Sequence, residues 1–187
     1  MMVIKLTSKL SKDIVKALEK VINAYRLHKY LIKKIRCDRE SVFRGCEELL
    51  RGKGIEVSFS SPGRHERRAE RCIRTLKGRI RATIFGLRYK LPRQLLERLI
   101  YDVVNTINLT PNTRTSPLHP SYLITGVITD FKKTLRAKFG DIVLCKTPNT
   151  DGRDIEQEQS QYGIVVGKDL STPGSILVFL ISSKAVV

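Results

Sequence analysis

The stretch SPGRHERRAERCIRTLKGRIRATIFGL, residues 61–87, carries the strongest pattern in this 187-residue chain. Its apolar residues recur on one side of a helix, at positions 69, 73, 76, 80 and 84. That spacing predicts a helix whose apolar face packs on a core. Pro62 and Gly63 stand where the preceding element has to end.

The remaining faces of this predicted helix are strongly cationic. Residues 64–90 contain ten Lys or Arg and two acidic residues, Glu66 and Glu70. By the i, i+4, i+7 rule, Glu70 shares one side of the helix with Arg74, Lys77 and Arg81. The pattern therefore predicts one carboxylate at the head of a basic face, and a solvated surface helix with an incidental glutamate is the alternative.

The charge of the whole chain favours a polyanionic partner. The formal net charge is +17 and the pI about 10.0, although 41% of the residues are hydrophobic. Residues 1–90 hold 24 basic and 9 acidic residues, whereas residues 91–187 hold 11 and 9. We therefore expect nucleic acid as the partner, DNA first and RNA as the alternative. A membrane surface is disfavoured because there is no Trp and the basic helix needs its apolar face for a core.

Cysteines and histidines do not form a metal-binding pattern in the sequence. No CxxC motif is present, and we expect reduced thiols, a nuclear or cytoplasmic protein that is not secreted, and no zinc site. No apolar run reaches membrane-spanning length. The residues concerned are Cys37, Cys46, Cys72 and Cys145, with His28, His65 and His119.

The first 60 residues alternate between strand and helix patterns, which predicts an α/β layout. Asp38 directly follows one of the strands, and carboxyl ends of strands are where α/β folds place their chemistry. The predicted elements are a strand at 1–7, a helix that Ser8 or Ser11 caps and that extends to about His28, a strand at 31–37, a helix at 43–50 and a strand at 55–60.

The second half contains one helix and then short β runs. Pro92 begins an apolar helix that extends to Asn108. Its pattern predicts a helix buried in a core, and a zipper that binds a partner is the alternative. Residues 131–137 form a basic linker between a domain at 1–130 and a small all-β domain at 138–187. The β runs are DIVLCK, YGIVVGK, SILVFLI and KAVV.

Several motifs, in their order along the chain, resemble copia-type LTR-retrotransposon integrases. IRCDRESVF and SPGRHERRAERCIRTLKGR resemble the segments that hold the second Asp and the Glu of the integrase core. PRQLLERLIYDVVNTIN and NLTPNTRTSP are similar to its closing helix and loop, and FGDIVLCK to ISSKAVV resembles the SH3-like barrel that follows. The resemblance spans nearly the whole chain and implies an RNase H-like core followed by an SH3-like β-barrel.

The resemblance also implies site residues. Asp38 and Glu70, with 31 residues between them, would be catalytic carboxylates that hold Mg²⁺ or Mn²⁺. The family transfers DNA strands with two metal ions held by three carboxylates. Arg74, Lys77 and Arg81 would contact successive phosphates away from the metals. The full set of expected nucleic-acid-binding residues is Arg64, Arg67, Arg68, Arg71, Arg74, Lys77 and Arg81.

The sequence departs from the family at the first catalytic Asp. That residue lies some fifty residues before the second in the family, but only 37 residues precede Asp38, and the sole Asp among them is Asp13 at a helix start. We therefore expect a core fragment that lacks its first two strands and one metal ligand. A different strand pairing, a degenerate or domesticated remnant, and a start further upstream are the open alternatives.

Three functions remain open from the sequence. The first is a nucleic-acid-binding protein derived from an integrase, without strand-transfer activity alone. The second is an integrase fragment completed by another chain or by an upstream segment. The third is a non-catalytic adaptor that uses the 92–108 helix and the β domain; a homo-oligomer stays open in each case.

Overall fold

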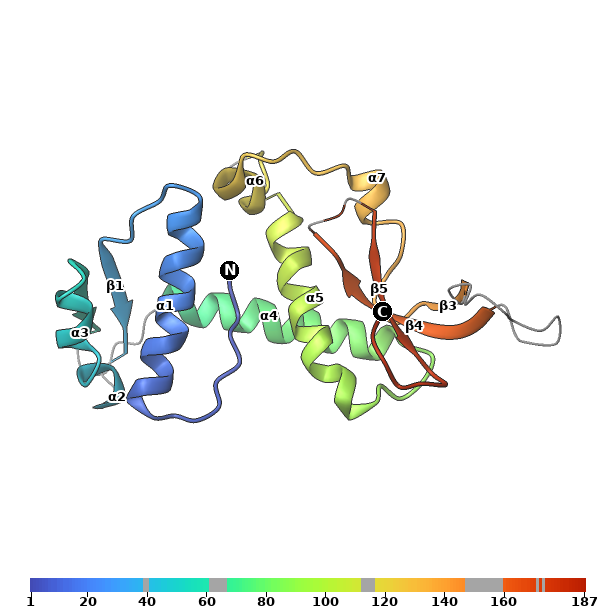
Figure 1. The fold of residues 1–187 in the computed structure, drawn as a ribbon, viewed down its shortest axis with the longest axis horizontal. Helices are drawn as coiled ribbons and strands as arrows, with labels where there is room; N and C mark the ends of the chain where they lie inside the picture. The colour runs from blue at the N-terminus through green and yellow to red at the C-terminus, as the bar shows by residue number, and fades with distance from the viewer. Residues whose placement is uncertain (39–40, 61–66, 112–116, 147–159, 171, 173) are drawn as a thin grey trace, which may run out of the picture. The chain divides into compact units, whose positions relative to one another are not determined.

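The computed structural model describes residues 1–38, 41–60, 67–111, 117–146, 160–170, 172 and 174–187 (Figure 1). The chain is mixed α/β, as the sequence predicts. Its contacts divide it into two compact units. Unit 1 comprises Met1–Lys77 and Leu123–Gly126, and unit 2 comprises Gly78–Tyr122 and Val127–Val187.

Unit 1 is built on a two-stranded parallel sheet. β1 (Lys34–Cys37) pairs with β2 (Glu56–Phe59), and α2 (Ser41–Arg44) and α3 (Glu47–Arg51) lie in the crossover between them. Parallel strands require such a crossover because the chain has to return to the same end of the sheet. The helix that precedes the sheet is α1 (Ser11–Leu27), and Ser8 donates its hydroxyl hydrogen bond to Asp13 in the first turn of α1.

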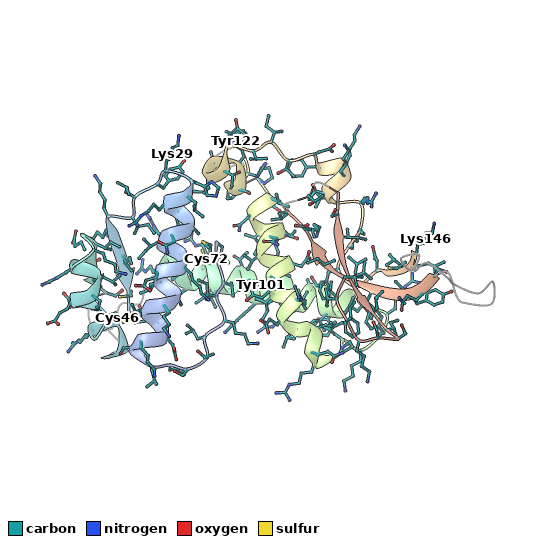
Figure 2. All side chains as sticks on the ribbon, viewed as in Figure 1. Lys29, Cys46, Cys72, Tyr101, Tyr122 and Lys146 are labelled. Atoms are coloured by element: carbon teal, nitrogen blue, oxygen red, sulfur yellow. The ribbon has the colours of Figure 1, made fainter. Side chains whose placement is uncertain are left out.

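The core of unit 1 lies on one face of this sheet. Ile35 and Val57 are paired in register and pack, together with side chains of α1, against the buried residues Cys46 and Leu50. Cys46, labelled in Figure 2, is completely buried. Strand side chains alternate between faces, so the neighbouring Lys34–Glu56 ion pair, 2.5 Å long, lies exposed on the other face.

Three predictions for unit 1 need correction. Residues 1–7 do not form the predicted strand, because they contain no regular structure. The predicted helix at 43–50 is divided into α2 and α3 around Gly45 and Cys46. The strands at 31–37 and 55–60 exist, but they are shorter than predicted, with four residues each.

The basic segment forms α4 (Arg67–Gly86), a helix of 20 residues. The helix itself is confirmed, but the expectation that its apolar face packs on a core is wrong: no residue of α4 is buried. Leu76 and Ile80 are half-buried, whereas Ile73 keeps 50% of its surface exposed. The division between the two units falls inside α4, between Lys77 and Gly78.

Unit 2 combines helices with a three-stranded antiparallel sheet of order β3-β4-β5. β4 is the central strand, and the chain end at Val186 adds one antiparallel bridge to Phe179 on β5. The elements after α4 are the 3-10 helix η1 (Arg93–Leu95), α5 (Leu96–Leu109), α6 (Pro120–Thr125), α7 (Phe131–Thr134), β3 (Ile142–Lys146), β4 (Ser160–Lys168) and β5 (Ile176–Leu180).

The core of unit 2 forms where α5 packs against β4. Leu99 of α5 is completely buried, and Val165 and Val166 of β4 are 1% exposed. The prediction that the helix after Pro92 is a core helix is therefore confirmed. Val103 and Val104 of α5 are buried as well, so these residues are not available for a zipper with a partner.

A buried ion pair joins the two elements of this core. Lys168 Nζ on β4 donates a hydrogen bond of 2.8 Å to Asp102 Oδ1 on α5. The Lys168 and Asp102 side chains are only 5% and 7% exposed. Because each charge has lost most of its hydration, the pair tolerates the loss of neither partner.

The contact-based units do not follow the division into 1–130, 131–137 and 138–187 that the sequence predicts. Residues 127–187 belong to one unit with 78–122, and the predicted linker contains α7, whose first turn is capped by the Asp130 carboxylate. That residues 1–130 and residues 138–187 fold as independent domains stays a prediction. Residues 151–158, which the sequence predicts to be a polar, acidic loop of the β domain, and the turn at 61–63 lie outside the described residues.

We predict that Asp102→Ala lowers the free energy of unfolding by about 3–5 kcal/mol, because it leaves the Lys168 ammonium buried without a counter-charge. Denaturant titration followed by circular dichroism measures the change. The double variant Asp102→Leu with Lys168→Met should recover most of the loss, since it removes both charges.

A matched control for this prediction is Glu56→Ala in the exposed Lys34–Glu56 pair, whose side chains are 43% and 63% exposed. Solvent screening limits its effect to less than about 1 kcal/mol. Equal losses for Asp102→Ala and Glu56→Ala would contradict the role assigned to burial.

Candidate nucleic-acid interface

The basic side chains of α4 are presented to solvent along the helix. Five of them fall within an arc of about 120° at 100° per residue. We define this set as the basic face of α4: Arg67, Arg71, Arg74, Lys77 and Arg81. All five are exposed, and the half-buried Leu76 and Ile80 lie on the opposite side.

The five cations of the basic face form no ion pairs within the described part of the chain. Glu70 lies within the same arc, in the first turn, where the helix dipole favours an anion. Unneutralised charges on a rigid helix attract a polyanion at long range, so the arrangement suits phosphate binding.

The other predicted basic residues flank this face. Arg68 is exposed and lies about 100° around the helix from Arg67, so it belongs to a neighbouring side of α4. Arg79 is also exposed on that side, and the sequence interpretation missed it because it lies off the line that begins at Glu70. Arg64 falls outside the residues that the structure describes.

The two predicted catalytic carboxylates both belong to unit 1. Asp38 follows the last residue of β1, Cys37, which is paired with Phe59 at the end of β2. Asp38 is therefore positioned at the carboxyl edge of the parallel sheet, as the sequence predicts. Glu70 is exposed on α4, and the convergence of both carboxylates on one metal ion stays a prediction.

The surroundings of Asp38 affect its neighbour. Burial raises the pKa of the Cys37 thiol, and the charge of Asp38 raises it further. Cys37 is therefore protonated at neutral pH and is no activated nucleophile. Within the described ranges there is no cluster of three or more His, Cys, Asp or Glu side chains that could hold a metal ion.

Unit 2 contains a cavity of about 1100 Å³ beside the second half of α4. Arg79, Arg88 and Lys138 contribute basic groups to its lining, and the Asp102–Lys168 pair lies in its wall. The sequence contains one signal for that pair, since Asp102 interrupts the apolar run of its helix, but nothing in the sequence indicates that Asp102 and Lys168 meet.

Tyr89 and Gly140 both line this cavity. The Tyr89 hydroxyl donates a hydrogen bond of 3.0 Å to the Gly140 carbonyl. Gly140 has a φ of +92°, and a Cβ atom there would come within 2.2 Å of Leu87 Cδ2. The backbone conformation therefore favours glycine at this position, and a larger residue would also displace the end of the Leu87 side chain.

Comparison with known proteins identifies no family for the chain. No protein-family model matches it, and no curated protein is similar enough to count as a relative. Separately, none of the helices in the described segments is long and apolar enough to cross a membrane.

We predict that Tyr89→Phe lowers the free energy of unfolding by about 0.5–1.5 kcal/mol near neutral pH, because it removes the hydrogen bond to Gly140. Burial, and to a smaller extent the charge of Asp141, raises the pKa of Tyr89 in the folded chain. The unfolded chain then loses the tyrosine proton first, so this contribution to stability falls as the pH rises above about 10.

Urea titrations at pH 8 and above pH 10 measure the effect. The difference between the natural chain and Tyr89→Phe should shrink at the higher pH. A difference that grows with pH would contradict this assignment.

Proposed function

We propose that the chain is a nucleic-acid-binding protein and that α4 carries the contact surface. The observation on which the proposal rests is the basic face of α4, whose five cations have no ion-pair partner in the described part of the chain. DNA phosphates would supply the missing counter-charges. The net charge of +17 would add a sequence-independent attraction over longer distances.

We further propose that this binding function derives from a copia-type integrase. The support is the order of features: Asp38 at the end of a parallel strand, α4 with Glu70, the apolar helix α5 and then an antiparallel sheet. In this proposal, unit 1 and α5 correspond to an RNase H-like core and β3–β5 to an SH3-like barrel. Asp38 and Glu70 would be the ligands of a Mg²⁺ or Mn²⁺ ion, which would polarise a phosphate oxygen.

A second candidate is an integrase piece that another chain completes. It is favoured by the small size of the unit 1 sheet, because among the described residues β1 and β2 have only each other as partners. Each strand therefore has an outer edge at which a further strand could pair. The adaptor function is disfavoured, because the apolar face of α5 is already buried against β4.

We predict that DNA binding depends steeply on salt and on the basic face of α4. If about 6–10 phosphates are contacted, the affinity should fall by about 10³–10⁵ between 50 and 200 mM salt. Changing Arg74, Lys77 and Arg81 to Glu should abolish most of the binding. Fluorescence anisotropy with a labelled duplex measures both effects.

The matched control changes three exposed lysines of α1, Lys12, Lys16 and Lys20, to Glu. This change lowers the net charge by the same amount as the triple change in α4. This control should weaken binding far less. If both triple variants lose the same affinity, general charge and not α4 causes the binding; if affinity does not respond to salt, the proposal is wrong.

We predict no strand transfer by the 187-residue chain alone. The resemblance accounts for two of three carboxylates, and in-line transfer requires both metal ions to be held. An increase of about 1.36 kcal/mol in the activation free energy slows a reaction tenfold. We therefore expect the missing ligand to lower the rate of strand transfer by several orders of magnitude. The assay uses the purified chain with Mg²⁺ or Mn²⁺ and a labelled DNA end.

Glu70→Gln is the informative variant in this assay. It should leave DNA binding unchanged or slightly stronger, because it removes a negative charge from the basic face. Metal-dependent product that disappears in Glu70→Gln would establish a working enzyme and overturn the prediction.

A further inference from the structure

α4 carries an exposed aromatic side chain in line with its basic face. Phe85, one residue before the end of the helix, keeps 86% of its surface exposed. At 100° per residue it lies on the same line as Arg67, about 20° from Arg74 and about 40° from Arg81. This aromatic ring therefore belongs to the charged side of α4.

The placement of Phe85 is unusual for a structural aromatic residue. The half-buried residues Leu76 and Ile80 lie about 140–180° away around the helix, so Phe85 is not part of the face that packs. A large exposed aromatic ring has an unfavourable contact with water that a ligand could remove. The ligand that covers it also has to tolerate the arginines beside it.

We infer that α4 binds nucleic acid at an unpaired base, with the phosphate backbone on the basic face and the base stacked on Phe85. This inference rests on the proposed function and specifies its substrate as a strand with an unpaired end, overhang or bulge. Arg67 and Arg81 are about 21 Å apart along the helix at 1.5 Å per residue. That length accommodates several consecutive phosphates before the strand reaches Phe85.

Charge and geometry favour a nucleic acid over the other possible occupants. A base has a π face for the ring and carries phosphates for the arginines, whereas an apolar protein surface would leave the arginines without counter-charges. A helix on an anionic membrane inserts its apolar face, which on α4 lies opposite Phe85. A fully paired duplex hides its base faces in the stack and offers Phe85 nothing to cover.

Gly78 is consistent with this path. It falls on the same line, between Arg74 and Arg81, and a Cβ atom added there would meet nothing within 4 Å. The middle of the contact line therefore has no side chain, so a strand could approach the helix backbone between the two arginines.

The test compares two DNA probes of equal length and charge: a fully paired duplex, and a duplex that carries 2-aminopurine at an unpaired position. Stacking on one aromatic side chain corresponds to about 5- to 100-fold in affinity. The natural chain should prefer the unpaired probe by at least about fivefold and quench its fluorescence. Phe85→Ala should abolish both the preference and the quenching while it changes duplex affinity by less than about twofold.

Two controls separate stacking from a structural effect. Phe85→Trp should restore the preference, because it restores an aromatic face, and Ile73→Ala should leave the preference unchanged, because Ile73 lies about 120° away on α4. Because Phe85 is exposed, Phe85→Ala should melt at the same temperature as the natural chain. A lower melting temperature, together with an equal loss of affinity for both probes, would overturn the inference.

The outcomes also separate this inference from the proposed function. Salt-dependent duplex binding without any preference for the unpaired probe would overturn the stacking role and leave the proposed function standing. Absence of binding to both probes would overturn both. Binding to vesicles of anionic lipid that is lost in Phe85→Ala, without a preference between the DNA probes, would assign Phe85 to a membrane and overturn the inference.

Discussion

The buried contact between Asp102 and Lys168 is the constraint on which the structure of unit 2 depends. Two charges with 5–7% side-chain exposure have lost most of their hydration, and their mutual 2.8 Å hydrogen bond compensates for that loss. The bond joins α5 to β4 across 66 positions of sequence, so it specifies how the apolar face of the helix meets the central strand. The cavity beside α4 has this pair in its wall, and its shape therefore depends on the same contact.

The helix α4 differs from α1 and α5, the other two long helices in the described segments, because it has no buried residue. A helix that is polar on most sides gains little from core packing and is typical of a solvated connection between compact parts. The division between units 1 and 2 within α4 agrees with that description. The side of α4 that carries the basic face is exposed, and Phe85 lies among its cations.

Binding and catalysis make different demands on these residues. Phosphate binding requires only cations at helical spacing, and α4 provides them along one helix. Two-metal catalysis requires three carboxylates from separate elements, held within tenths of an ångström. Asp38 and Glu70 come from a strand end and a helix start, and the described part of the chain contains no third acidic ligand clustered with them. The proposed binding function therefore needs fewer precisely placed groups than the catalysis of the integrase family.

The sequence by itself determined those features that depend on local spacing. The helices at 11–27, 67–86 and 96–109, the strands after residue 140 and the position of Asp38 at a strand end all follow from periodicity of 3.6 or 2 residues and from turn residues. Only the tertiary structure decided what each face meets. It left α4 without a buried residue, divided the chain inside α4, kept residues 1–7 out of a sheet and brought Asp102 to Lys168. The physical reason is that periodicity reports only which residues share a face, whereas burial and ion pairing depend on contacts between segments that are distant in sequence.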